Sequence, residues 1–92
     1  MTEPKPEQRM KPVSFWVLPG ISGKPSDPWP LRGIAKISGD RVTALLSRKR
    51  IKQGSYLHVG LDDKRTEPPI RCYALQSYAI TAGRYLTRLA SI

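Results

Sequence analysis

Residue types that perform covalent or acid–base chemistry are scarce in this sequence. Its 92 residues include one histidine, His58, and one cysteine, Cys72. Nucleophilic catalysis needs a nucleophile, a base and an orienting group within hydrogen-bond reach. Both residues fall inside expected strands, and the adjacent Asp62 and Asp63 lie among other charged residues, as in a solvated loop. No C-x-x-C, H-E-x-x-H, Walker or G-x-G-x-x-G motif occurs. We therefore predict that the protein is not an enzyme and uses no metal or cofactor.

Positive charge is the chemistry that this sequence supplies in quantity. Lysine and arginine total 16 against 7 acidic residues, which gives a net charge of +9. Such a field commonly serves to hold a polyanion, although solubility alone is an alternative use. Four of the cations fall within five positions: Arg48, Lys49, Arg50 and Lys52. A solvated turn is the alternative interpretation of this cluster.

Aromatic residues near these cations suggest which polyanion is bound. Tyr56 leads the strand that follows the basic cluster, and Trp29 lies between two prolines in a polar loop with no evident core to enter. Cations can contact the phosphates of a single-stranded nucleic acid while aromatic rings stack on its bases. On the first expected strand, Phe15 and Trp16 must point to opposite faces, so that one of them enters the core.

The elements that must position these side chains are short strands. Leu57, Val59 and Leu61 alternate with Tyr56, His58 and Gly60, as in a half-buried strand. Ser38-Gly39-Asp40 supplies the turn of a hairpin between two further strands. Residues 76–84 fit either a strand or one helical turn ended by Gly83. The predicted strands are residues 13–18, 31–37, 41–46, 56–61, 70–75 and 85–92.

This strand pattern predicts the fold class. Nine prolines and seven glycines disfavour a helical bundle. Residues 1–12 hold three prolines and charges of both signs, which predicts a flexible, disordered tail. We expect residues 13–92 to form a single all-β domain, a small five- to six-stranded OB-like or SH3-like barrel.

Compartment signals are few but agree with one another. No apolar run approaches the roughly 20 residues that a membrane-spanning helix needs, and the N-terminus lacks the apolar region of a signal peptide. A single cysteine excludes an internal disulfide and fits a reducing compartment. We expect a cytoplasmic protein with no membrane association.

Three short motifs resemble one protein family. They are Ser22-Gly23-Lys24-Pro25 after the first strand, Gly54-Ser55-Tyr56 with His58 just beyond, and Ser77-Tyr78-Ala79-Ile80 before the last strand. In type and order they are similar to motifs in the single-stranded-DNA-binding proteins of filamentous bacteriophages. The chain departs from that family at Ser26, where an aromatic residue usually follows the Lys-Pro pair, and it is longer between the second and third motifs.

The resemblance implies a function, a setting and a partner. It implies a homodimer that coats single-stranded DNA during phage DNA replication in the host cytoplasm, without sequence preference and without a small-molecule substrate. It also implies phosphate contacts at Lys24, Arg48, Lys49, Arg50 and Arg88, with base stacking on Trp29, Tyr56 and Tyr78. The complete set of predicted nucleic-acid contacts is Lys24, Trp29, Arg48, Lys49, Arg50, Lys52, Tyr56, Tyr78, Arg84 and Arg88.

Three other functions fit the composition. A phage- or plasmid-encoded inhibitor or interaction module could use its basic face to bind an acidic protein. An RNA-binding protein would use the same chemistry on a different strand. A small basic ribonuclease that works through arginine, lysine and tyrosine would leave no recognisable motif.

Overall fold

The chain folds into six strands and no helix over the residues that its computed structural model describes, which are 8–18, 29–39, 41–63 and 67–92. No helix in these segments could cross a membrane. All six predicted strands are present. They are β1 (Gln8–Leu18), β2 (Leu31–Ser38), β3 (Arg41–Ser47), β4 (Tyr56–Leu61), β5 (Ile70–Thr81) and β6 (Arg84–Ser91).

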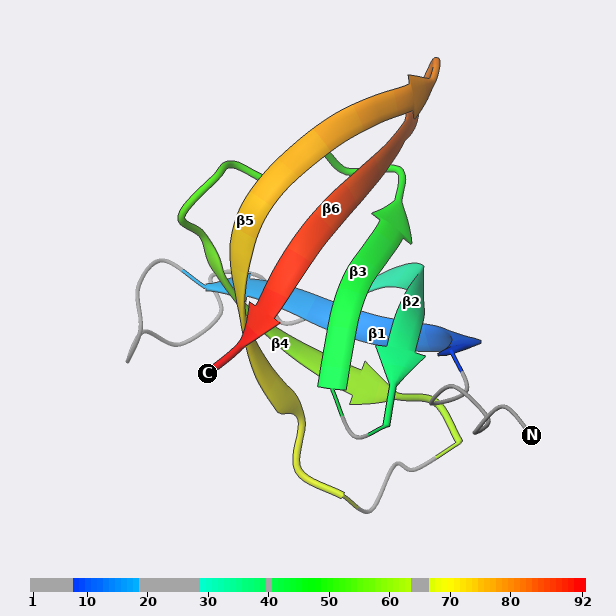
Figure 1. Cartoon of the computed structure of the whole chain (residues 1–92), viewed down its shortest axis with the longest axis vertical. Coiled ribbons are helices and arrows are strands. Elements are labelled where there is room, and N and C mark those ends of the chain that lie inside the picture. Colours follow the sequence, from blue (N-terminus) through cyan, green and yellow to red (C-terminus); the bar gives the residue numbers. More distant parts are fainter. Residues whose placement is uncertain (1–7, 19–28, 40, 64–66) are drawn as a thin grey trace, which may run out of the picture.

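The strands form one closed antiparallel barrel in the order β1-β2-β3-β6-β5-β4 (Figure 1). Strands β1 to β3 make one meander and strands β4 to β6 make another. Pairing of β3 with β6 and of β1 with β4 joins the two meanders into a barrel. The predicted fold class, a small OB-like β-barrel, is confirmed.

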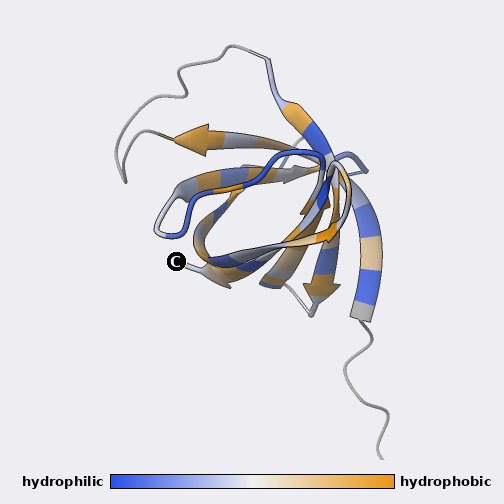
Figure 2. Cartoon of the chain, turned by 90° about the horizontal axis from the view of Figure 1, so that it is seen from above, coloured by the Kyte–Doolittle hydropathy of each residue, from blue (hydrophilic) through white to orange (hydrophobic). Residues whose placement is uncertain are grey.

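Hydrophobic and hydrophilic residues alternate along the strands (Figure 2). This alternation decides which side chains fill the barrel. Phe15 is fully buried, whereas Trp16 faces outward and is half-buried. Leu57 and Val59 are fully buried on β4, as the sequence predicts, and Leu61 on the same face is only partly buried but packs against the core. The remaining large core residues are Val13, Ile37, Val42, Leu45, Ile51 and Leu89.

The N-terminal boundary of the domain differs from the prediction. Strand β1 begins at Gln8, so residues 8–12 belong to the barrel and not to a tail, whereas residues 1–7 lie outside the described segments. These residues pair with β2 from Gln8↔Ser38 onward through their backbone, which requires no apolar side chains. Pro12 is tolerated because β1 pairs with β4 only from Val13 onward, and a strand edge needs no N–H donor there.

The C-terminal hairpin also corrects an expectation. The helical alternative for residues 76–84 is wrong, because β5 continues to Thr81 and pairs with β6 through Ser77↔Thr87 and Tyr78↔Leu86. Cross-strand pairing of this kind satisfies the backbone groups that a helical turn would otherwise satisfy. Gly83 supplies the positive φ of 78° in the connecting turn. The resulting β5–β6 hairpin extends beyond the other strands (Figure 1).

Strands β2 and β3 approach each other closely at Gly33. A Cβ atom at this position would lie 2.7 Å from the carbonyl oxygen of Leu46 and 3.3 Å from Cε1 of Phe15. Only glycine fits there without a shift of the backbone. Gly60 on β4 differs, since a Cβ atom would find its nearest neighbour, the Ser14 carbonyl oxygen, at 3.8 Å.

We predict that Gly33→Ala lowers the free energy of unfolding by about 1–3 kcal/mol, because the added methyl group overpacks the core. The matched control is Gly60→Ala, which adds the same methyl group at ordinary van der Waals distances from its neighbours and leaves stability unchanged or slightly raised. Urea denaturation followed by circular dichroism measures both. Equal stability of the two variants would contradict the close approach of β2 and β3.

Candidate nucleic-acid interface

The basic cluster lies on a loop that is fixed to the barrel at several points. Ile51 is only 2% exposed and enters the core. The Ser47 hydroxyl contacts both the N–H (3.3 Å) and the carbonyl oxygen (3.0 Å) of Lys49. The Gly54 N–H donates to the carbonyl oxygen of Ala74 at 2.9 Å. This basic loop therefore holds its exposed cations on an ordered backbone. They are Arg48, Lys49, Arg50 and Lys52.

Three arginines from three parts of the chain converge on one groove in the outer surface. Arg32 comes from β2, Arg48 from the start of the basic loop and Arg84 from the start of β6. Ile34 and Leu46 form the apolar floor between them. We call this site the arginine groove. Guanidinium groups around an apolar floor can bind phosphates at the sides and a flat apolar surface in the middle.

The floor of the groove continues as an apolar row across four strands. Register places Ile34 opposite Leu46, Leu46 opposite Leu86, and Leu86 opposite Tyr78. Ile34 and Tyr78 are each 41% exposed. With adjacent strands about 4.8 Å apart, the row spans roughly 14 Å from β2 to β5. The row is an open surface on which bases can stack.

A second set of cations lies on the other side of the apolar row. Lys36 on β2 and Arg88 on β6 both flank Ala44 in the register. Arg88 is also opposite Gln76, whose Oε1 accepts a hydrogen bond of 2.5 Å from the Tyr78 hydroxyl. The apolar row thus has arginines on one side and Lys36 and Arg88 on the other.

Charge is divided unequally over the described part of the chain. The described residues include twelve lysines and arginines but only three carboxylates, which are Asp62, Asp63 and Glu67. All three carboxylates follow β4, so none of them lies on β2, β3, β5 or β6. The outer face of these four strands therefore attracts anions, and one of its arginines, Arg32, is paired with Asp62 from beside it.

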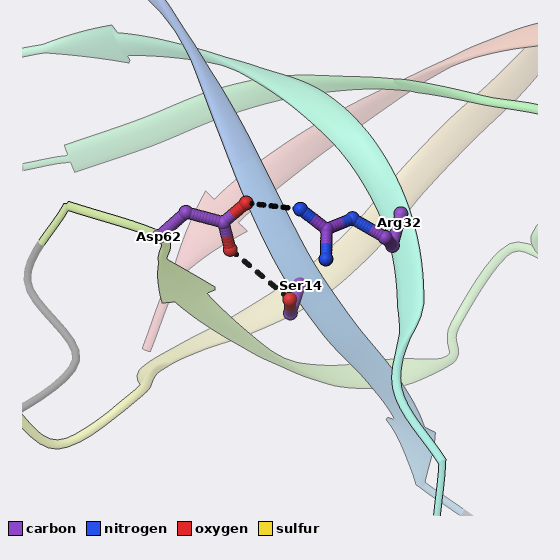
Figure 3. Close-up of polar contacts among 3 residues, drawn as sticks. All are labelled: Ser14, Arg32 and Asp62. Atoms are coloured by element: carbon purple, nitrogen blue, oxygen red, sulfur yellow. Dashed lines mark hydrogen bonds and ion pairs between the residues drawn. The ribbon is translucent and has the colours of Figure 1, made fainter.

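Arg32 is a site residue that sequence analysis missed, and a carboxylate holds it in place (Figure 3). Its Nη2 lies 2.8 Å from Oδ2 of Asp62, and the Ser14 hydroxyl donates to Oδ1 of the same carboxylate at 3.1 Å. The alternation of β2 could have indicated this role. Residue 32 shares its parity with Ile34 and Lys36, opposite to the buried residues of the strand.

The structure brings together some of the predicted contacts and separates others. Arg48, Arg84, Arg88 and Tyr78 lie on the outer face of β3, β6 and β5 or at its edge, while Arg50 and Lys52 line a neighbouring depression with Gln76 and Ser77. The two other aromatic residues that were predicted as contacts, Tyr56 and Trp29, lie elsewhere. Tyr56 is half-buried on β4 and packs edge-to-face on Tyr73 at 5.3 Å. Trp29 is 77% exposed just before β2. Lys24 is outside the described residues.

Side chains that could act as nucleophiles or bases are held in structural positions. Cys72 is fully buried, and burial raises the pKa of its thiol to about 11. His58 points out of β4 between its register neighbours Trp16 and Arg71. Asp63 is paired with Lys11 at 2.6 Å. No group of three histidine, cysteine or acidic residues that could hold a metal ion occurs in the described part of the chain.

Comparison with protein-family models, curated proteins and solved structures found no match to this chain. The candidate interface consists of an ordered basic loop, an arginine groove and an exposed apolar row on one side of the barrel.

The buried thiol gives a prediction that tests the interior of the barrel. Because burial raises the pKa of Cys72 to about 11, the folded protein should react with a disulfide reagent at pH 8 at least about 100-fold more slowly than the urea-unfolded chain. The free energy of unfolding contributed by the thiol should be present below pH 9 and fall as the pH rises toward 11. Rapid labelling of the native protein would show that β4 and β5 do not enclose this residue.

Proposed function

We propose that the protein binds single-stranded nucleic acid, DNA in the first place, along the outer face of β2, β3, β6 and β5, with no catalytic activity. The observation that carries this proposal is the arginine groove, where Arg32, Arg48 and Arg84 surround an apolar floor. Arginines alone would suit any polyanion. The exposed apolar row between two sets of cations suits a polyanion whose bases are unpaired.

The proposed contacts divide into two kinds. Phosphates lie against the arginines on one side of the row and against Lys36 and Arg88 on the other. Each neutralised phosphate on a single strand contributes about 0.7 to the slope of affinity against salt concentration on logarithmic axes. Bases lie on Ile34, Leu46, Leu86 and Tyr78, and stacking of a base on the Tyr78 ring is worth about 1–3 kcal/mol. Neither kind of contact reads sequence, so the binding is sequence-tolerant.

Double-stranded DNA fits this surface less well. Its bases are stacked inside the helix, so that only its phosphates can reach the arginine groove and the apolar row remains exposed to water. RNA offers the same phosphates and base faces as DNA and is the main alternative ligand. The resemblance to phage proteins favours DNA, bound in the host cytoplasm.

A protein contact is favoured by one further observation on the β5–β6 hairpin. Leu75 and Ile80 are 40% and 54% exposed, in a run from Cys72 to Gly83 that carries no charge. Strand β5 pairs with β4 only as far as Tyr73. An uncharged strand edge of this kind readily pairs with another chain. Because an uncharged strand edge can pair with the same edge of an identical chain, we propose that the partner is a second copy of this chain.

The nucleic-acid site is tested by removing two of its charges. We expect Arg48→Ala combined with Arg84→Ala to weaken binding of a thymidine oligomer of about 20 nucleotides and to lower the salt slope by about 1.4. The control removes two exposed arginines near the ends of β3 and β5 that line neither the groove nor the apolar row, Arg41→Ala with Arg71→Ala, and should lower the slope by less. Fluorescence anisotropy at several salt concentrations measures both.

Equal losses in the two double variants would mean that charge in general, and not the groove, attracts the strand. The same titration with duplex DNA and with an RNA oligomer separates the remaining ligands. Weaker binding of the duplex supports the role of the apolar row. Tighter binding of RNA than of DNA would overturn the choice of DNA.

The dimer is tested by changing its proposed contact. We expect the native protein to have twice the chain mass in light scattering after size-exclusion chromatography, and Ile80→Ser to shift it toward the monomer. The control is Met10→Ser, which removes an equally exposed apolar side chain, 57% against 54%, from β1. A monomeric native protein, or an unchanged dimer in Ile80→Ser, would contradict this contact.

A further inference from the structure

A half-open pocket of about 280 Å³ lies beyond the arginine groove, on the other side of Arg32. The Trp16 ring and the apolar side chains of Pro30, Leu61 and Pro69 form its walls. Asp62 and Glu67 contribute carboxylates to its lining. We call it the tryptophan pocket. It lies at the junction of β1 and β4, whereas the groove lies on β2, β3 and β6.

The tryptophan ring is accessible because of a glycine on the neighbouring strand. Trp16 faces outward from β1, and Gly60 on β4 is in register with Ser14 on the same outer side. A Cβ atom at Gly60 would stand 4.0 Å from Cζ3 of Trp16, with nothing else nearer than 3.8 Å. Any larger side chain would occupy the space in front of the ring. The pocket therefore offers an aromatic surface to a flat ligand.

The polar groups of the pocket restrict what that ligand can be. Asp62 is held by the Ser14 hydroxyl at one oxygen and by Arg32 at the other, so its position is fixed (Figure 3). A carboxylate has about four acceptor sites, which leaves Asp62 able to accept further hydrogen bonds. Two carboxylates repel phosphate groups but accept hydrogen bonds from N–H donors. The ligand must thus be flat, apolar on its faces and a donor at its edge.

Guanine matches these requirements better than the other bases. Its Watson–Crick edge presents the N1–H and the N2 amino group side by side, an arrangement that pairs with both oxygens of a carboxylate. Uracil and thymine present a single N–H between two carbonyl oxygens, which the carboxylates repel. Cytosine and adenine each offer one amino group beside an acceptor nitrogen. Pockets that bind an unstacked base commonly combine stacking with hydrogen bonds to this edge.

We propose that the tryptophan pocket binds a guanine base of the same strand whose phosphates lie in the arginine groove. This inference rests on the proposed function and adds a preference to it. Arg32 connects the two sites, because it lines the groove and also holds the carboxylate of the pocket. One guanine enters the pocket while neighbouring nucleotides follow the groove without being read.

The test compares two oligomers with and without the pocket. A thymidine oligomer with one central guanine should bind the native protein at least about fivefold more tightly than the same oligomer without it. Gly60→Val should abolish this gain and leave the affinity for the plain thymidine oligomer unchanged, because valine suits a strand and fills the space before Trp16. Glu67→Gln removes one carboxylate from the pocket and should reduce the extra affinity for the guanine-containing oligomer, while the arginine groove is unchanged.

A second readout uses the tryptophan itself. In a Trp29→Phe variant, Trp16 is the sole tryptophan, and guanosine monophosphate should quench its fluorescence at lower concentration than the adenosine, cytidine or uridine monophosphates do. Equal quenching by all four nucleoside monophosphates would overturn the proposal. It would also be overturned if Gly60→Val still bound the guanine-containing oligomer more tightly than the plain one. If Gly60→Val does not fold, Gly60→Ala replaces it, and it should lose part of the preference for guanine. If the native protein does not bind the plain thymidine oligomer at all, the proposed function itself is refuted.

Discussion

Closure of the barrel is the constraint on which every other feature of this molecule depends. Pairing of β1 with β4 and of β3 with β6 leaves each strand residue on one of two sides, the core or the outer surface. A core of this size holds only a limited set of apolar side chains. The apolar residues that exceed it must therefore lie outside, and four of them, Ile34, Leu46, Leu86 and Tyr78, form one row between cations.

The two candidate sites share a residue, which makes the surface continuous. Arg32 belongs to the groove through its place on β2 and to the tryptophan pocket through its pairing with Asp62. The Ser14 hydroxyl completes this arrangement from β1. The basic loop joins the surface from the other end, since Ile51 and the Gly54 N–H hold it against the barrel. Ordered cations lose little conformational freedom when a ligand binds, which favours affinity.

Sequence reasoning predicted the barrel well because its strongest signals are local. Alternation on β4 and the opposition of Phe15 and Trp16 follow from the two-residue period of a strand. The added strand residues 8–12 and the second half of β5 were missed, because their pairing with a distant strand outweighs a polar or ambiguous local pattern. The site was only partly predicted for the same reason. Arg32 is far in sequence from the basic cluster, and Tyr56 is drawn away from it by packing on Tyr73.

The position of the three described carboxylates has a consequence for how the molecule meets its ligand. They gather after β4, and the cations dominate the strands on the other part of the barrel. A charge distribution of this kind gives the protein a dipole moment in addition to its net charge. In the field of a nucleic-acid strand the molecule turns before contact, so that its cationic side leads, and a larger share of diffusional encounters begins in a productive orientation.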